Sequence, residues 1–169
     1  MSQKHDSLRI KVKGDVMRII LTLFSLFSMV SYGATSPETQ KYLVNLLKAN
    51  DSVHSAFVKN DEQGVKPVWA NFEKVLSGSA PNELKEFVSE SKVATVKLVS
   101  ASAFDEKRKL YGDVIKPIVA MLQKFGPIDS YKVFTCPMVK KDWIQDTKLN
   151  SEVQNPYDPK MVKCGMMRE

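Results

Sequence analysis

Apolar side chains recur every three or four residues along most of the chain, from Tyr42 to Phe125. This spacing places them on one stripe of an α-helix, and turn-forming residues interrupt it three times. The interruptions separate four predicted helices, at about 36–57, 65–76, 81–101 and 105–125. Ser36 is expected to cap the first helix, and Pro117 is expected to kink the fourth. Because each stripe must be buried against a partner, we predict a mainly α fold, an antiparallel four-helix bundle.

The pattern changes after Gly126 and Pro127. Residues 131–135 alternate in the manner of a short β-strand, and residues 160–167 are its expected antiparallel partner. The intervening residues 137–159 are predicted to form a long loop, of a kind that is often functional or held by a cross-link. We therefore expect residues 35–169 to form one helical-bundle domain. Within it, residues 127–169 are expected to form a small irregular or β-hairpin module, called the C-terminal module below.

The N-terminal segment has a different character. A twelve-residue apolar run at 19–30 follows Arg9, Lys11, Lys13 and Arg18 and precedes small residues. This order predicts a secretory signal peptide over residues 1–34, with a buried core helix as the alternative. The run is shorter than the roughly 20 apolar residues that cross a bilayer. A periplasmic or secreted protein with no membrane span after signal removal is therefore expected.

The charge balance argues against a nucleic-acid partner. The chain has 25 Lys and Arg against 19 Asp and Glu, and five of these basic residues lie in the predicted signal peptide. The remaining charges are scattered, and no basic run is interleaved with aromatic residues. Nucleic-acid binding usually requires positive charge concentrated on one face, so no nucleic-acid partner is expected.

Sulfur-bearing side chains concentrate near the C-terminal end of the sequence. Both cysteines and four of the eight methionines lie between 136 and 167. Thiolate and thioether are soft ligands that favour copper(I) over magnesium, calcium or manganese. Zinc is less favoured because His54 is the one histidine outside residues 1–34. If the strands pair, the candidate metal ligands are Cys136, Cys164, Met138, Met161 and Met166.

A structural disulfide is the competing interpretation of the two cysteines. An exported protein encounters conditions in which disulfides form. A bridge between Cys136 and Cys164 would close a 29-residue loop, which is worth roughly 3 to 4 kcal/mol in the chain-entropy model. Methionines near a terminus are also ordinary fillers at the edge of a core. The sequence leaves both interpretations open.

Other polar and aromatic candidates carry weaker signals. His54 lies near the apolar stripe of the first predicted helix, where a lone histidine is usually packed rather than a ligand. Trp143 and Tyr157 lie outside the helical stripes and are expected either to cover the sulfur cluster or to pack the C-terminal module on the helices. No phosphate-binding glycine loop or paired catalytic acids are evident, so an enzyme is not expected and no catalytic residue is proposed.

The C-terminal module carries a resemblance to a known family. Its residues Phe134-Thr135-Cys136-Pro137-Met138, Trp143, Asn155-Pro156-Tyr157 and Lys160-Met161-Val162-Lys163-Cys164-Gly165 resemble the C-terminal signature of an uncharacterised bacterial family of exported helical domains. That family includes free-standing secreted proteins and extensions of some copper-efflux adaptor subunits. The resemblance implies a periplasmic helical bundle that binds copper or a related heavy metal.

The sequence also departs from that signature. Asp158-Pro159 stand where the family usually has an aromatic residue and a glycine, which puts the turn before Met161 in question. Val139-Lys140 follow the Cys-Pro-Met triplet, where a short heavy-metal motif continues with His-Pro.

Two functional hypotheses follow. The first is an exported protein that binds copper(I), with silver as a second candidate ion, for buffering or for delivery to a copper-efflux or other envelope protein. The alternative is a disulfide-stabilised periplasmic interaction or adaptor domain that holds no metal. Both place the decisive chemistry at Cys136 and Cys164.

Overall fold

The computed structural model describes residues 35–168, and they are mainly helical. The four α-helices of this range are α2 (Pro37–Val58), α3 (Glu62–Leu76), α4 (Lys85–Ser100) and α5 (Phe104–Phe125). A short 3₁₀ helix, η2 (Asn82–Leu84), leads directly into α4. The predicted signal peptide at 1–34 lies outside the described residues.

Local sequence signals explain where the first two helices begin. Ser36 precedes α2, and its hydroxyl accepts a hydrogen bond from the Thr39 amide, as expected for an N-cap. Asp61 does the same for α3 by accepting from the amide of Gly64. This cap starts α3 three residues before the predicted start at 65, and Pro67 falls in the second turn of the helix.

The C-terminal module forms a small antiparallel sheet of three strands. Its strands are β1 (Tyr131–Cys136), β2 (Lys141–Asp146) and β3 (Met166–Met167), in the spatial order β2-β1-β3. A tight hairpin joins β1 to β2, with Cys136 paired to Lys141 at its closed end. The strand β3 pairs with the other edge of β1, with Met166 opposite Thr135 and Met167 opposite Phe134.

The sheet corrects one sequence prediction and confirms part of another. The prediction that residues 137–159 form a loop is wrong, because Lys141–Asp146 form β2. This strand lacks the usual alternation of buried and exposed residues, since three consecutive residues, Trp143, Ile144 and Gln145, are buried. The expected pairing of β1 with the end of the chain is confirmed only at two residues, because residues 160–164 form turns instead of a strand.

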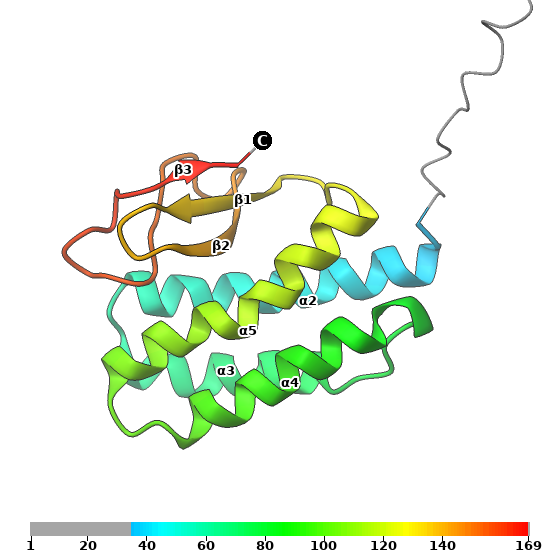
Figure 1. The fold of residues 1–169 in the computed structure, drawn as a ribbon, viewed down its shortest axis with the longest axis horizontal. Coiled ribbons are helices and arrows are strands. Elements are labelled where there is room, and N and C mark those ends of the chain that lie inside the picture. Colours follow the sequence, from blue (N-terminus) through cyan, green and yellow to red (C-terminus); the bar gives the residue numbers. More distant parts are fainter. Residues whose placement is uncertain (1–34, 169) are drawn as a thin grey trace, which may run out of the picture. The chain divides into compact units, whose positions relative to one another are not determined.

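The sheet packs on one side of the helices. It lies over α2 and α5, while α3 and α4 lie on the far side of these two helices (Figure 1). The core of the described residues consists mainly of fully buried apolar side chains, among them Leu43, Leu46, Leu47, Ile115 and Ile118. Phe134 and Trp143 extend this core into the sheet, so the strand that ends at Cys136 stands on an apolar base.

Candidate functional site

Cys136 is the last residue of β1 and is fully buried. Residues 137–140 form the hairpin turn, which closes with a hydrogen bond of 2.8 Å from the Lys140 amide to the Cys136 carbonyl. Lys140 has a φ of 53°, in the left-handed region that tight turns require. The same turn brings the backbone amides of Met138 and Val139 near the Cys136 sulfur, where they lower the pKa of its thiol.

Cys164 reaches the same place from the other edge of the sheet. Its amide donates to the Met161 carbonyl at 2.8 Å, which turns the chain just before β3. Gly165 then passes against Trp143, and a Cβ atom at this position would lie 2.3 Å from the Trp143 ring. A glycine is therefore required where the chain leaves Cys164, and this explains the Cys-Gly pair of the sequence.

The two thiols meet in the structure. Their Sγ atoms lie 3.2 Å apart, and both cysteines are unbridged. A disulfide bond would need about 2.05 Å between the sulfurs, and two sulfurs on one ion could stand up to about 4.6 Å apart if each metal–sulfur bond is about 2.3 Å. The observed spacing lies between these values, so a shift of about 1 Å would reach either state.

The two thiols differ in acidity. Burial alone would raise the pKa of Cys136, but hydrogen bonds from the Val139 amide, the Cys164 thiol, the Met138 amide and the Asn155 side chain outweigh it and lower that pKa. The pKa of Cys164 is raised, because its thiol donates to Cys136 and because it is partly buried beside that sulfur. Cys136 is thus the more acidic thiol of the pair, and Cys164 is the less acidic one.

Asn155 organises the site and was not among the residues singled out from the sequence. It is fully buried, its side-chain amide donates to the Cys164 carbonyl at 3.1 Å, and its side-chain oxygen accepts from the Tyr157 amide at 2.9 Å. Its backbone amide also donates to the Val162 carbonyl. No periodic pattern marks such a residue. Its position in the Asn-Pro-Tyr segment of the resemblance was the one available signal.

Trp143 and Tyr157 are buried, as predicted for the packing of the C-terminal module. The Trp143 ring stacks on Phe134 at 5.6 Å between centroids and meets the edge of Tyr157 at 6.2 Å. The Tyr157 hydroxyl donates to the Asp142 carbonyl. The Trp143 ring also lies close to Gly165, the residue that follows Cys164.

The candidate methionines differ in exposure. Met138 is 70% exposed and Met166 is 57% exposed, whereas Met161 is half-buried. Among residues 35–168, no group of three or more His, Cys, Asp or Glu side chains is placed to hold a metal ion. Any ion held by both cysteines would therefore depend on sulfur ligands.

His54 is a packed residue of α2. It is 2% exposed, and its Nε2 atom donates to the Gln154 carbonyl at 2.7 Å. Burial lowers its pKa to about 4, so the ring is neutral near pH 7. This hydrogen bond fastens residue 154 to the helix, just before the Asn-Pro-Tyr segment.

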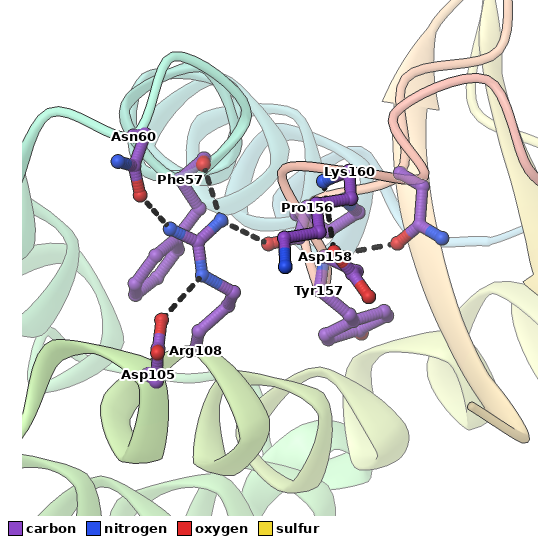
Figure 2. A network of polar contacts seen from close by, with 9 residues as sticks. Phe57, Asn60, Asp105, Arg108, Pro156, Tyr157, Asp158 and Lys160 are labelled. Atoms are coloured by element: carbon purple, nitrogen blue, oxygen red, sulfur yellow. Dashed lines mark hydrogen bonds and ion pairs between the residues drawn. The ribbon is translucent and has the colours of Figure 1, made fainter.

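Arg108 of α5 is the second anchor of that segment and was also not foreseen from the sequence. Its guanidinium is 1% exposed and donates to the carbonyls of Phe57, at 2.8 Å, and Pro156, at 3.2 Å, and to the side chain of Asn60 (Figure 2). Asp105 lies 3.7 Å from its Nε atom. One buried cation thus ties the end of α2 to the loop that carries Asn155.

Comparison with known proteins adds no assignment. No family model, curated protein or solved structure matches this chain. Within the part of the chain that the structure describes, no helix is both long enough and apolar enough to span a membrane.

Proposed function

We propose that the protein is an exported metal-handling protein that binds copper(I), and silver(I) as its chemical analogue, through the thiolates of Cys136 and Cys164. The observation that supports this most strongly is the pair of unbridged sulfurs 3.2 Å apart. Two cysteines 28 positions apart in the sequence converge on one point, where each is held by its own turn.

The donor set favours a soft monovalent ion. Thiolates select copper(I) over hard cations, and zinc in structural sites usually takes four ligands from Cys, His, Asp or Glu. The described residues offer two such ligands here, and thioethers are the nearest further donors in the sequence.

The protonation asymmetry of the pair also suits metal binding. Hydrogen bonds from two backbone amides and from Asn155 lower the pKa of Cys136, so its thiol gives up a proton to a metal ion more readily than an ordinary cysteine. Cys164 must release its proton when it coordinates. At least one proton per ion is therefore expected to leave the site on loading.

The proposal also covers the helices that support the site and the protein that would receive the ion. We infer that the four helices act as an antiparallel bundle that supports the site, because Phe57 of α2 packs on Tyr111 of α5 with ring centroids 5.0 Å apart. The resemblance of the C-terminal module to extensions of copper-efflux adaptors suggests delivery to an efflux or other envelope protein, with periplasmic or secreted localisation.

Titration of the reduced protein with copper(I), against a competing chelator, tests the proposal. Wild-type protein should take up one ion, and Cys136→Ser and Cys164→Ser should each weaken binding at least tenfold, in line with the loss of a metal ligand. Far-UV circular dichroism should show that both variants keep their helices. Unchanged affinity in both variants would contradict the proposal.

The second candidate is a disulfide-stabilised interaction domain without metal. The same 3.2 Å spacing favours it, because a small rotation of either side chain would bring the sulfurs to bonding distance. Thiol counting on protein isolated from the periplasm, unfolded without reductant, separates the two. Two free thiols per chain support metal handling, whereas none supports the structural bridge.

A further inference from the structure

Helix α4 presents apolar side chains on two faces. The buried side chains of this helix are Val88, Ser91, Thr95 and Leu98. Its outer face carries Val93, Val96 and Val99, which are 61%, 66% and 53% exposed. Valine is a weaker helix former than alanine, leucine or lysine, so helix propensity does not explain three exposed valines. An apolar outer face of this kind indicates a surface that contacts another molecule.

The outer face has the spacing of a coiled-coil seam. Four exposed residues of α4 follow one another at intervals of four, three and four positions: Ser89, Val93, Val96 and Ser100. This is the spacing with which one helix packs along another. The order of side chains is the same in either direction, with a serine at each end and two valines between them.

This symmetry makes the outer face complementary to itself. A second α4 running antiparallel would place valine against valine and serine against serine. The two-fold axis that relates the two copies would cross the helix between Ala94 and Thr95. The serines at the ends are small, so they allow the two helices to approach closely.

The charged residues beside the seam favour the antiparallel direction. Glu90 and Lys97 are both exposed and lie seven positions apart, so they flank the seam on the same side. In an antiparallel pair the same sides of the two helices meet, which brings Glu90 of each copy near Lys97 of the other. In a parallel pair Lys97 would instead face Lys92 of the second copy, and like charges repel. Among residues 35–168, the ion pairs within the chain involve none of these three side chains.

We propose that the outer face of α4 is a self-association surface, through which two copies of this chain form a two-fold dimer with their α4 helices antiparallel. The inference goes beyond the proposed function, because it uses neither the thiols nor a metal ion. The valines supply the apolar contact, and the two Glu90–Lys97 pairs set the direction. One helix face is smaller than the interface of a tight complex, so the dissociation constant should be on the order of 100 μM.

Sedimentation velocity of the full chain at a series of concentrations, in reductant so that no disulfide links two copies, tests the proposal. Wild-type protein should show a monomer–dimer equilibrium. Val96→Glu should weaken association roughly tenfold or more, because it places a carboxylate against Val93 of the second copy. Leu149→Glu is the matched control, since Leu149 is 68% exposed but lies outside α4, and it should leave the equilibrium unchanged. Far-UV circular dichroism should show that both variants keep their helices.

Two charge variants test the direction of the helices. Lys97→Glu should also weaken association roughly tenfold, because two carboxylates would then meet across the interface. The double variant Glu90→Lys plus Lys97→Glu exchanges the charges, so it should restore association to within about threefold of wild type. Since Glu90 and Lys97 are seven positions apart on one helix, neither change breaks a pair within the monomer.

Each outcome is decisive. A monomer at every concentration would overturn the proposal, and so would a dimer that Val96→Glu leaves intact, since another surface would then be responsible. Stronger association of Lys97→Glu would show a parallel pair and overturn the antiparallel arrangement. Equal weakening by Leu149→Glu would show that added charge alone opposes association. If Val96→Glu loses its helices, the two charge variants decide. Copper(I) titration of the same proteins measures the proposed function separately, so either proposal can fail without the other.

Discussion

The helices and the C-terminal module are stabilised in different ways. The helices bury mostly leucine, isoleucine and valine side chains that need no specific partner beyond close packing, and three of their buried polar residues, Asn50, His54 and Arg108, donate to the C-terminal module. The C-terminal module depends on buried polar groups, including Gln145 and Asn155, and on Arg108 reaching across from α5. Apolar burial is spread over many residues, whereas a buried hydrogen bond is lost completely when one partner is removed. The helices should therefore tolerate substitution better than the module that carries the thiols.

The largest effect is expected for Arg108→Met. The change keeps much of the side-chain volume but removes donors to two buried carbonyls and to Asn60. Unpaired buried carbonyls are costly, so the free energy of unfolding should fall by about 3 kcal/mol. Urea unfolding measures this loss. The control Arg168→Met removes an exposed ion pair with Asp142 and should cost less than about 1 kcal/mol.

Gly165→Ala should have a smaller but more local effect. The added Cβ atom would meet the Trp143 ring, and Gly165 also has a φ of 155°, which alanine rarely adopts. Overpacking of this kind costs about 2 kcal/mol. The displaced chain should also separate the thiols, so alkylation of Cys136 in the native protein should speed up. Gly126→Ala is the comparison, because that position has a positive φ but no crowding neighbour. Equal alkylation rates in the two variants would contradict the expected role of the Trp143 contact.

Asn155→Ala should have two effects, a modest loss of stability and a change in the acidity of Cys136. Loss of its hydrogen bonds to the Cys164 carbonyl and the Tyr157 amide should lower the free energy of unfolding by about 1 to 2 kcal/mol. The pKa of Cys136 should rise, because one donor to its thiolate disappears. Thiolate absorbance near 240 nm against pH measures this rise. A Cys136 pKa that does not move would show that the backbone amides alone hold the thiolate.

The smallest effect concerns pH, and it arises where the sheet meets α2. Burial raises the pKa of Asp51 to about 6, even though Tyr131 donates to its carboxylate. Since the folded pKa exceeds the ordinary value of 3.8, ionising Asp51 lowers stability as pH rises from about 4 to 6. Burial lowers the pKa of His54 from 6.5 to about 4, so its contribution to stability grows as pH rises through the same window.

These two contributions oppose each other, so the wild-type melting temperature should change less between pH 4 and 6.5 than that of either variant. In Asp51→Asn only His54 still contributes to the pH dependence, and stability should rise more steeply with pH. In His54→Gln only Asp51 still contributes to the pH dependence, and stability should fall relative to wild type as pH rises over the same range. Differential scanning calorimetry at several pH values checks both slopes. Identical slopes in all three proteins would show that neither group titrates as described.

The same division explains what could be predicted from the sequence. The helices could be predicted because a stripe such as Leu43, Leu46 and Leu47 repeats with the helical period. The strand β2 was missed because Trp143, Ile144 and Gln145 are buried together. Arg108 could not be predicted as a buried residue, since its carbonyl partners Phe57 and Pro156 are distant in the sequence. Asn155 could not be predicted either, because the turns that bring its main-chain partners to it have no periodic signal. The sulfur chemistry could be anticipated from residue types, but the acidity difference between the thiols depends on backbone amides that only the fold positions.

The shortness of β3 has a consequence for behaviour at high concentration. Because β3 covers β1 only opposite Phe134 and Thr135, the other end of that edge is left to Tyr131 and Lys132. An open strand edge is a template for another chain, and lysine is a common guard against such pairing. Arg168 shortens the open edge, since its amide donates to the Val133 carbonyl, while its side chain is paired with Asp142. Self-association through this edge is therefore opposed by charge repulsion, and it should weaken as salt concentration falls.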